Sequence, residues 1–414
     1  MVEGTCLGAG RPHTPRSAGR RRRAWLAPWP VQPLQAARRV GAAAAAAAVA
    51  LSLGGCWNAI PIGHRALIQI LAVDPGKGTN LRWTFFQANP TALAQMGSGV
   101  GSASPGGGTT SQQVVPIAVD APSLAVAYRQ AQDVTSRDLY LGQLQQIVLS
   151  ERLSPAQVRL AIDSLAHTPE LDQSQAMFAA PGGAAKTILQ PDPQELFPAS
   201  YLEHVTDCPT CNNVAIHLSL MDAFLATRTA WGSMLMPEVG KSALGLAARG
   251  AATYEGARLV ARVTPADATL LGLMTGATVK TSLDVPVPGL GMASVRSVRA
   301  RSATHARWVH GRVEGALHIR LAGELVALEP ERGLAFNKIV PALNQALASA
   351  VAQRAGALVA RLTAEGGDPL ELGRELWSAD PSAAPTGAAW RAGLAHARLR
   401  LVVNAALSSE GPVR

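Results

Sequence analysis

Two cysteines and two histidines lie close together in the sequence, at His204, Cys208, Cys211 and His217. Their spacing, H-x3-C-x2-C-x5-H, could supply four tetrahedral zinc ligands. A Cys-x-x-Cys pair can also carry out thiol redox chemistry, because a helix dipole and the second sulfur stabilise the attacking thiolate. In an oxidising compartment, two such cysteines in a loop most often form a structural disulfide. We therefore expect a Cys208–Cys211 disulfide first, the zinc set or free thiols next, and redox work last.

The rest of the sequence shows no recognisable catalytic motif. There is no GxSxG nucleophile elbow, no HExxH and no pair of carboxylates in a known motif. The glycine-rich segment 97–111 fits neither GxGxxG nor GxxxxGK[ST], so we expect a surface loop there and no phosphate site. His305, His310 and His318 lie in strand-like sequence, where a solvated or hydrogen-bonded role is the default. We predict no catalytic residue and no cofactor, and we do not expect an enzyme.

A third cysteine, Cys56, ends a segment that is typical of bacterial lipoprotein leaders. Arginines up to Arg39 precede an apolar run, Val40 to Leu53, and Gly54 and Gly55 precede the cysteine. This apolar run has about 14 residues. It is shorter than the ~20 residues that a helix needs to span a bilayer, so we interpret it as part of a leader. Cys56 is the predicted lipidation site and the first mature residue. Two acyl chains would anchor it stably, since each buried CH₂ contributes about 0.8 kcal/mol.

Removing the leader changes the charge of the chain. The full sequence has 37 basic and 28 acidic residues, and the leader holds eight arginines and one glutamate. The mature chain therefore keeps 29 basic and 27 acidic residues, a net charge of +2. No face is visibly loaded with Lys and Arg in the way that a phosphate-binding surface requires. We expect no nucleic acid as a partner.

Periodicity predicts alternating strands and helices between Cys56 and residue 192. Asp74 to Asn80 should be the loop of a hairpin, and Ser123 should begin a helix with Leu124, Tyr128 and Ala131 on one face. Strands are expected at 66–73, 81–88, 114–119, 147–149 and 177–180, and helices from 123, at 155–165 and at 186–189.

The pattern becomes irregular from Pro191 to Val239, which contains five prolines, and then turns strand-rich. Thr264, Pro265 and Asp267 are expected to begin a helix with a capping box. Leu317, Ile319 and Leu321 should line the buried face of a strand. Further strands are expected at 247–254, 258–263 and 399–405, a long one-faced helix at 336–362, and a short helix at 370–377.

These elements predict an α+β fold of mixed sheets flanked by helices, ending in an antiparallel sheet with a long packing helix. The mature chain has about 359 residues, which is more than a single hydrophobic core usually supports, so several domains are expected. We place a leader at 1–55, an N-terminal α/β domain at 56–192, a linker and middle domain at 193–290, and a C-terminal α+β domain at 291–414.

The order of several short motifs resembles the Ger(x)C family of spore germination lipoproteins. No motif is specific alone, but their collinear order covers essentially the whole mature chain. The motifs are Leu53 to Trp57, Gln87 to Leu93, Arg137 to Leu144, Thr168 to Leu171, Gly183 to Leu189, Gly250 to Val260, Leu372 to Arg374, and Trp377.

The resemblance implies a C subunit of a nutrient germinant receptor with no enzymatic activity. Such a subunit would be tethered by Cys56 to the outer face of the spore inner membrane, beside two integral membrane subunits of the A and B types. It also implies three mixed α/β domains in an elongated arrangement. Only the lipid role of Cys56 is carried over to a residue of this sequence.

Two other functions share some of these features. A solute-binding lipoprotein of a transporter would have the same anchor, but it predicts two similar lobes around one ligand cleft. An envelope thiol oxidoreductase would use Cys208 and Cys211 as a reactive pair. The change of pattern toward an antiparallel C-terminal unit favours the receptor subunit over the solute-binding lipoprotein, and a titration of the two thiols would decide the oxidoreductase.

Overall fold

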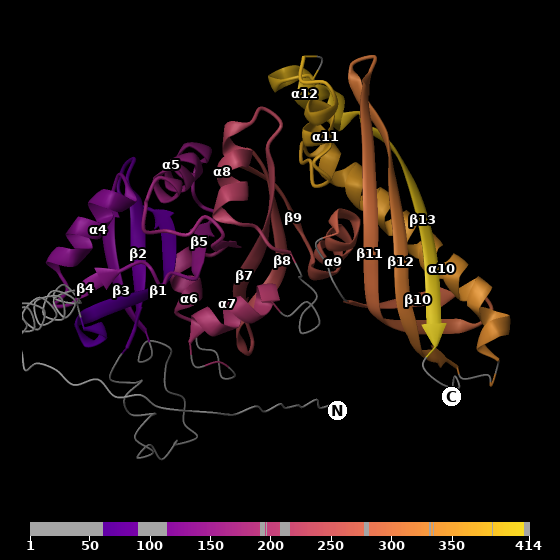
Figure 1. Ribbon diagram of the computed structural model, residues 1–414, viewed down its shortest axis with the longest axis horizontal. Coiled ribbons are helices and arrows are strands. Elements are labelled where there is room, and N and C mark those ends of the chain that lie inside the picture. The colour runs from indigo at the N-terminus through magenta and orange to yellow at the C-terminus, as the bar shows by residue number, and fades with distance from the viewer. Residues whose placement is uncertain are drawn as a thin grey trace, which may run out of the picture. The chain divides into compact units, whose positions relative to one another are not determined.

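The computed structural model describes residues 61–89, 114–190, 195, 197–207, 216–276, 281–330, 333, 335–382 and 384–409. The chain divides into a unit of residues 1–61 and a compact unit of residues 62–414, and every element described below belongs to the second unit (Figure 1). Cys56, the glycine-rich segment 97–111, Cys208 and Cys211 lie outside the described residues.

The first sheet is mixed, with a parallel centre and antiparallel flanks. Its order is β3-β2-β1-β5-β6-β7-β8-β9, with the short β4 paired to β1. Strands β1, β5, β6 and β7 run parallel, whereas β2, β3, β8 and β9 join by antiparallel pairing. The strands are β1 (Arg65–Pro75), β2 (Leu81–Ala88), β3 (Val114–Ala121), β4 (Asp138–Tyr140), β5 (Gln146–Ser150), β6 (Ala176–Ala180), β7 (Ser233–Ser242), β8 (Gly245–Glu255) and β9 (Arg258–Val263).

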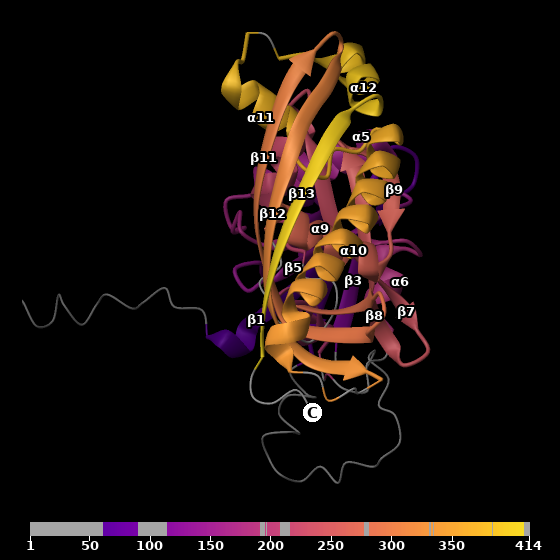
Figure 2. The ribbon, with the colours of Figure 1, turned by 90° about the vertical axis from the view of Figure 1, so that its right-hand side faces the viewer.

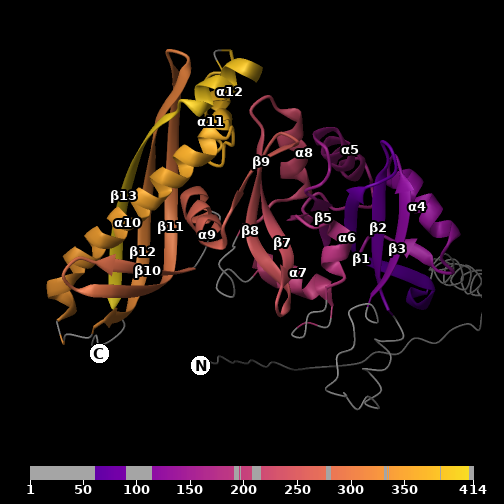
Figure 3. The same cartoon turned by 180° about the vertical axis from the view of Figure 1, so that it is seen from behind.

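Helices cover both faces of this sheet, as Figures 1 and 3 show. One core joins the sheet to α4, α5 and α8, and a second core joins the other face to α6 and α7. In β1, Leu71 and Val73 belong to the first core, and Ile70 and Ala72 to the second, which explains why the strand is continuously apolar. The helices are α4 (Leu124–Asp133), α5 (Pro155–Ala166), α6 (Ala184–Ile188), α7 (Pro198–Asp207) and α8 (Leu220–Arg228).

The first half of the predicted pattern is confirmed where it is described. The hairpin pairs Pro75 with Leu81, and the Ser123 hydroxyl accepts from the backbone N–H of Val126 at the start of α4. The irregular interpretation of 191–239 was wrong, because its described residues contain α7, α8 and most of β7. Proline does not exclude a helix at its first residue, where the missing N–H has no intrahelical partner, and Pro198 begins α7 there.

The second sheet has the order β10-β11-β12-β13. Strands β10, β11 and β12 pair antiparallel, but β13 runs parallel to β12, a direction that the sequence did not indicate. The strands are β10 (Thr281–Val287), β11 (Gly291–Val309), β12 (Arg312–Glu329) and β13 (Arg398–Ser409), and the helices are α9 (Pro265–Thr275), α10 (Phe336–Ala364), α11 (Leu372–Ala379) and α12 (Gly387–Ala395).

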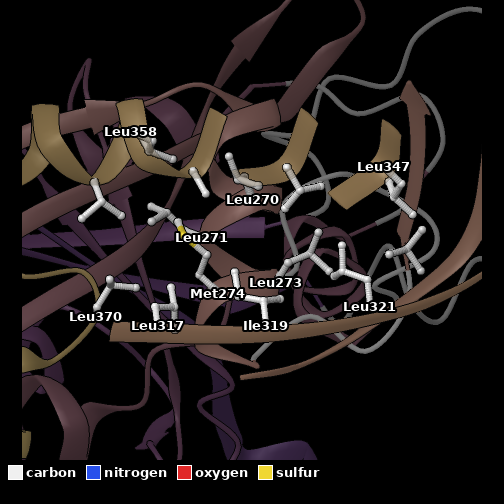
Figure 4. Close-up of a cluster of buried hydrophobic side chains, with 14 of the residues drawn as sticks. Leu270, Leu271, Leu273, Met274, Leu317, Ile319, Leu321, Leu347, Leu358 and Leu370 are labelled. Carbon is white, nitrogen blue, oxygen red and sulfur yellow. The ribbon is translucent and has the colours of Figure 1, made fainter. Parts of the chain in front are cut away.

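Helices α9 and α10 pack on one face of this sheet, and Figure 2 shows α10 running along it. Leu317, Ile319 and Leu321 of β12 point from the sheet into this core, as predicted from their alternation. In the close-up of Figure 4 they belong to one cluster with Leu271 of α9 and Leu358 of α10. The predicted stripe along α10 is therefore its buried face.

The start of α9 differs in one detail from the predicted capping box. The Thr264 hydroxyl accepts from the backbone N–H of Asp267 at 3.2 Å, as expected. The Asp267 carboxylate, however, lies 3.4 Å from Arg361 of α10. The acidic residue thus links two helices of the core instead of closing the box.

The α+β class, with mixed sheets, flanking helices and a C-terminal sheet packed by a long helix, is confirmed. The domain boundaries stay a prediction, although the first sheet continues from β1 to β9 across the expected boundary at residue 192. Among the described residues, no helix combines the length and the apolar composition needed to cross a membrane.

Candidate functional site

The two histidines of the predicted zinc set lie in the described part of the chain. His204 is in the last turn of α7, with Nδ1 2.9 Å from Oε1 of Glu195, and His217 is exposed just before α8. No group of three or more His, Cys, Asp or Glu side chains among the described residues could hold a metal ion. Because Cys208 and Cys211 fall outside these residues, the disulfide, the zinc set and the redox pair all stay predictions.

The most unusual charged cluster is one that sequence reasoning missed. Glu151, which follows β5, and Glu238 of β7 are nearly buried, with 1% and 8% of their side chains exposed. Arg262 of β9 covers them from the solvent side: its Nε donates to Oε2 of Glu151 at 2.5 Å and lies 3.8 Å from Oε2 of Glu238. Two carboxylates therefore share one arginine.

Burial is the main reason that the pKa of Glu238 rises to about 7, and the negative charge of Glu151 adds to it. Burial likewise raises the pKa of Tyr254, on β8, above its ordinary value. The hydrogen bond to Glu151 raises the pKa of Arg262, so the arginine stays charged. Glu238 thus holds a proton close to neutral pH, beside a carboxylate that is ion-paired.

The backbone around this cluster is locally irregular. Register shifts occur beside Glu238 in the β7–β8 pair and beside Thr253 in the β8–β9 pair. Gly250, opposite Glu238, has φ +115°, and a Cβ there would lie 2.0 Å from the carbonyl oxygen of Val263. Only glycine fits this close approach without strain. The cluster is therefore set by sheet geometry between strands far apart in the sequence.

A cleft of about 740 Å³ lies between α8 and α11. Its wall includes Trp231 and Trp377, whose rings stack with centroids 5.3 Å apart. The charged groups at its edge are already partnered: Asp222 accepts from the Ser219 hydroxyl at 2.6 Å, and Arg374 lies 2.8 Å from Glu371. The cleft offers an aromatic wall, and neither Glu151 nor Glu238 lines it.

The comparisons with known proteins identify the chain. The model of the spore germination protein N-terminal domain matches residues 58–241. The model described as spore germination B3/GerAC like, C-terminal, matches residues 249–411. The chain belongs to this family of spore germination proteins. The Ger(x)C resemblance seen in the sequence is confirmed, and with it the assignment to the C subunits of germinant receptors.

A solved structure shares the Ger(x)C fold seen here. The crystal structure of the GerBC protein superposes with a TM-score of 0.51 over 81% of this chain and 96% of that chain, at 14% sequence identity. At this identity the similarity shows the fold alone. The search of curated proteins finds no match. Neither the transporter interpretation nor the oxidoreductase interpretation has support in these comparisons.

The two family models meet at the β7–β8 hairpin, between residues 241 and 249. Most of β8 and all of β9 fall in the C-terminal model, but both strands complete the first sheet. The ion pair between Arg262 and Glu151 therefore joins the parts matched by the two models. This places the buried cluster at the seam of the Ger(x)C chain, where it ties one part to the other.

Proposed function

We propose that this chain is a lipid-anchored subunit of a nutrient germinant receptor that acts through binding and not through catalysis. The observation that carries the proposal is the collinear match of both family models, from residue 58, two residues after Cys56, to residue 411, two residues beyond the end of β13. The leader pattern before Cys56 supports the anchor. The proposed location is the outer face of the spore inner membrane, with integral A-type and B-type subunits as partners.

The absence of a catalytic role is also part of the proposal. The cluster of Glu151, Glu238 and Arg262 contains two carboxylates and a cation, but neither glutamate lines the cleft at Trp231 or the hollow described below. A substrate would need an open path to such a group. We assign the cluster to stability at the seam between the two matched parts.

The anchor is tested with Cys56→Ala, which removes the sulfur that would carry the lipid. We expect this variant to leave the spore membrane fraction and to lower nutrient-triggered germination, while the wild-type chain stays in that fraction. Exposed Ser382→Ala is the matched control and should change neither readout. Membrane retention of Cys56→Ala together with an unmodified wild-type N-terminus would contradict the anchor.

A further inference from the structure

One face of the second sheet carries a dense group of basic side chains. Exposed residues alternate along β11, β12 and β13 on the side opposite the core of Leu317, Ile319 and Leu321. We call this surface the basic face, and it consists of Arg299, Arg301, Arg307, Arg320, Arg398 and Arg400, with His305 and His318. The expectation that no face is loaded with Lys and Arg was wrong, because the net charge of +2 does not show how the charges are distributed.

The strand register brings these side chains together. Arg301 of β11 lies directly opposite Arg320 of β12, and His305 is opposite Ala316, which in turn is opposite Arg400 of β13. Like charges directly opposite each other across two strands destabilise a sheet. Folding alone therefore does not explain the Arg301–Arg320 pair, which points to an external partner.

The charges of the basic face are only partly balanced by acidic side chains in the described part of the chain. None of its six arginines forms an ion pair with a described residue. Glu314 lies opposite Arg307 and Arg398 in the sheet, but its carboxylate is 2.6 Å from Arg312. Glu324 lies 3.2 Å from Arg296, and Glu375 lies 3.9 Å from His305. The six guanidinium groups keep their full positive charge, and their hydrogen-bond donors are open to solvent.

A hollow of about 920 Å³ adjoins the basic face at the end where β13 begins. It is lined by His305, Arg307, Arg398 and Arg400, by the single carboxylate of Glu314, and by α10 residues such as Ala360. Its volume lies in the range of ordinary ligand sites. Guanidinium groups bind phosphate in a bidentate manner, so the hollow is suited to a phosphate-bearing group.

We propose that the basic face binds the headgroups of an anionic phospholipid membrane. Residues that alternate along a strand are roughly 7 Å apart and neighbouring strands about 5 Å, so the arginines form an array that matches a surface with many anionic groups. The inference rests on the proposed function, because a lipid on Cys56 would hold the face at high effective concentration near such a surface. The anchor then supplies attachment, and the basic face supplies orientation.

The binding of the basic face to lipid can be tested without the anchor by measuring vesicle binding of a polypeptide of residues 57–414. This polypeptide lacks Cys56 and the leader but keeps the compact unit. The probes are vesicles of phosphatidylcholine alone and of three parts phosphatidylcholine to one part phosphatidylglycerol. The test variant is Arg301→Glu with Arg400→Glu. The matched control is Arg129→Glu with Arg159→Glu, two exposed arginines on α4 and α5. Thermal unfolding of each variant checks that the fold is retained.

We expect binding to the anionic vesicles alone. Each basic residue near an anionic surface contributes about fivefold to affinity, so losing two should weaken binding about 30-fold, with a still larger loss on charge reversal. The control pair should stay within about threefold of the wild type. The proposal would be overturned if the wild type did not bind the vesicles, or if it bound a DNA duplex more tightly than the vesicles. It would also be overturned if the test variant bound like the wild type, or if the test and control variants lost equal affinity. None of these results bears on whether Cys56 carries a lipid, which the membrane fractionation decides.

Discussion

Arg262 of β9 forms an ion pair with Glu151, 111 residues earlier in the chain, although the glutamate is almost completely buried. About half of the Arg262 side chain is exposed to solvent, so the arginine lies between the buried glutamate and the solvent. Removing one partner of a buried ion pair leaves an uncompensated charge, which costs more than the pair contributes. The stability of the seam should therefore depend on this single arginine.

The variant Arg262→Gln tests this dependence. We expect the free energy of unfolding to fall by about 3 kcal/mol at pH 8. The loss should be smaller at pH 5, because the raised pKa of Glu238 keeps that glutamate protonated there and fewer buried charges lose their partner. Denaturant unfolding at both pH values measures it. Arg374→Gln, which breaks an exposed pair with Glu371, is the control and should cost less than about 1 kcal/mol; similar losses for the two variants would contradict the account.

Glu238 gives the fold a defined dependence on pH. Its pKa is raised from 4.5 to about 7 in the folded chain, so the folded state keeps a proton that the unfolded state releases. The stability of the wild type should therefore fall as pH rises from about 4.5 to about 7. Gln at position 238 stays neutral at every pH. The decrease in unfolding free energy over this pH range should therefore be smaller in Glu238→Gln by on the order of 1–2 kcal/mol, after allowance for solvent screening.

The measurement for Glu238→Gln is the unfolding free energy at a series of pH values from 4 to 8. Part of the slope should survive in this variant, because burial also raises the pKa of Asp368 to about 6. Glu365→Gln, which changes an exposed carboxylate just after α10, should leave the wild-type curve unchanged. A Glu238→Gln curve that is parallel to the wild type would refute the assignment.

Two helical glycines should respond to alanine in opposite directions. A Cβ at Gly393 of α12 would lie 2.0 Å from the ring of Trp308, whereas a Cβ at Gly356 of α10 has no atom within 4 Å. Gly393→Ala should lower stability by about 1–3 kcal/mol through overpacking. Gly356→Ala should raise it by about 0.5–1 kcal/mol, since alanine favours helix. Thermal unfolding compares them, and a stabilised Gly393→Ala would show that the α12 packing is misplaced.

Much of the fold could be predicted because its signals are local. The alternation of Leu317, Ile319 and Leu321 and the cap at Thr264 depend only on neighbouring residues. The helix α8 had such a signal too, in the reciprocal capping box of Ser219 and Asp222, but the surrounding prolines concealed it. The parallel direction of β13 could not be predicted, because it depends on the end of the sheet at which the connection through α10, α11 and α12 finishes.

The functional surfaces were harder to predict, for two different reasons. Glu151 and Glu238 carry no local motif, and strand pairing alone brings them together with Arg262. The basic face did have a signal in Arg299, Arg301 and Arg307, which share the strand period of two. It was lost because charge was judged over the whole mature chain. Charge assessed separately for each face of a predicted strand would have revealed it.

The most direct test of the central claim is the germination of spores that lack this chain, followed by the loss of optical density after nutrients are added. We predict that such spores germinate slowly or not at all with the nutrients that this receptor senses, respond normally to a trigger that bypasses nutrient receptors, and recover when the wild-type chain is restored. Unchanged germination with every nutrient to which the wild-type spores respond would contradict the account.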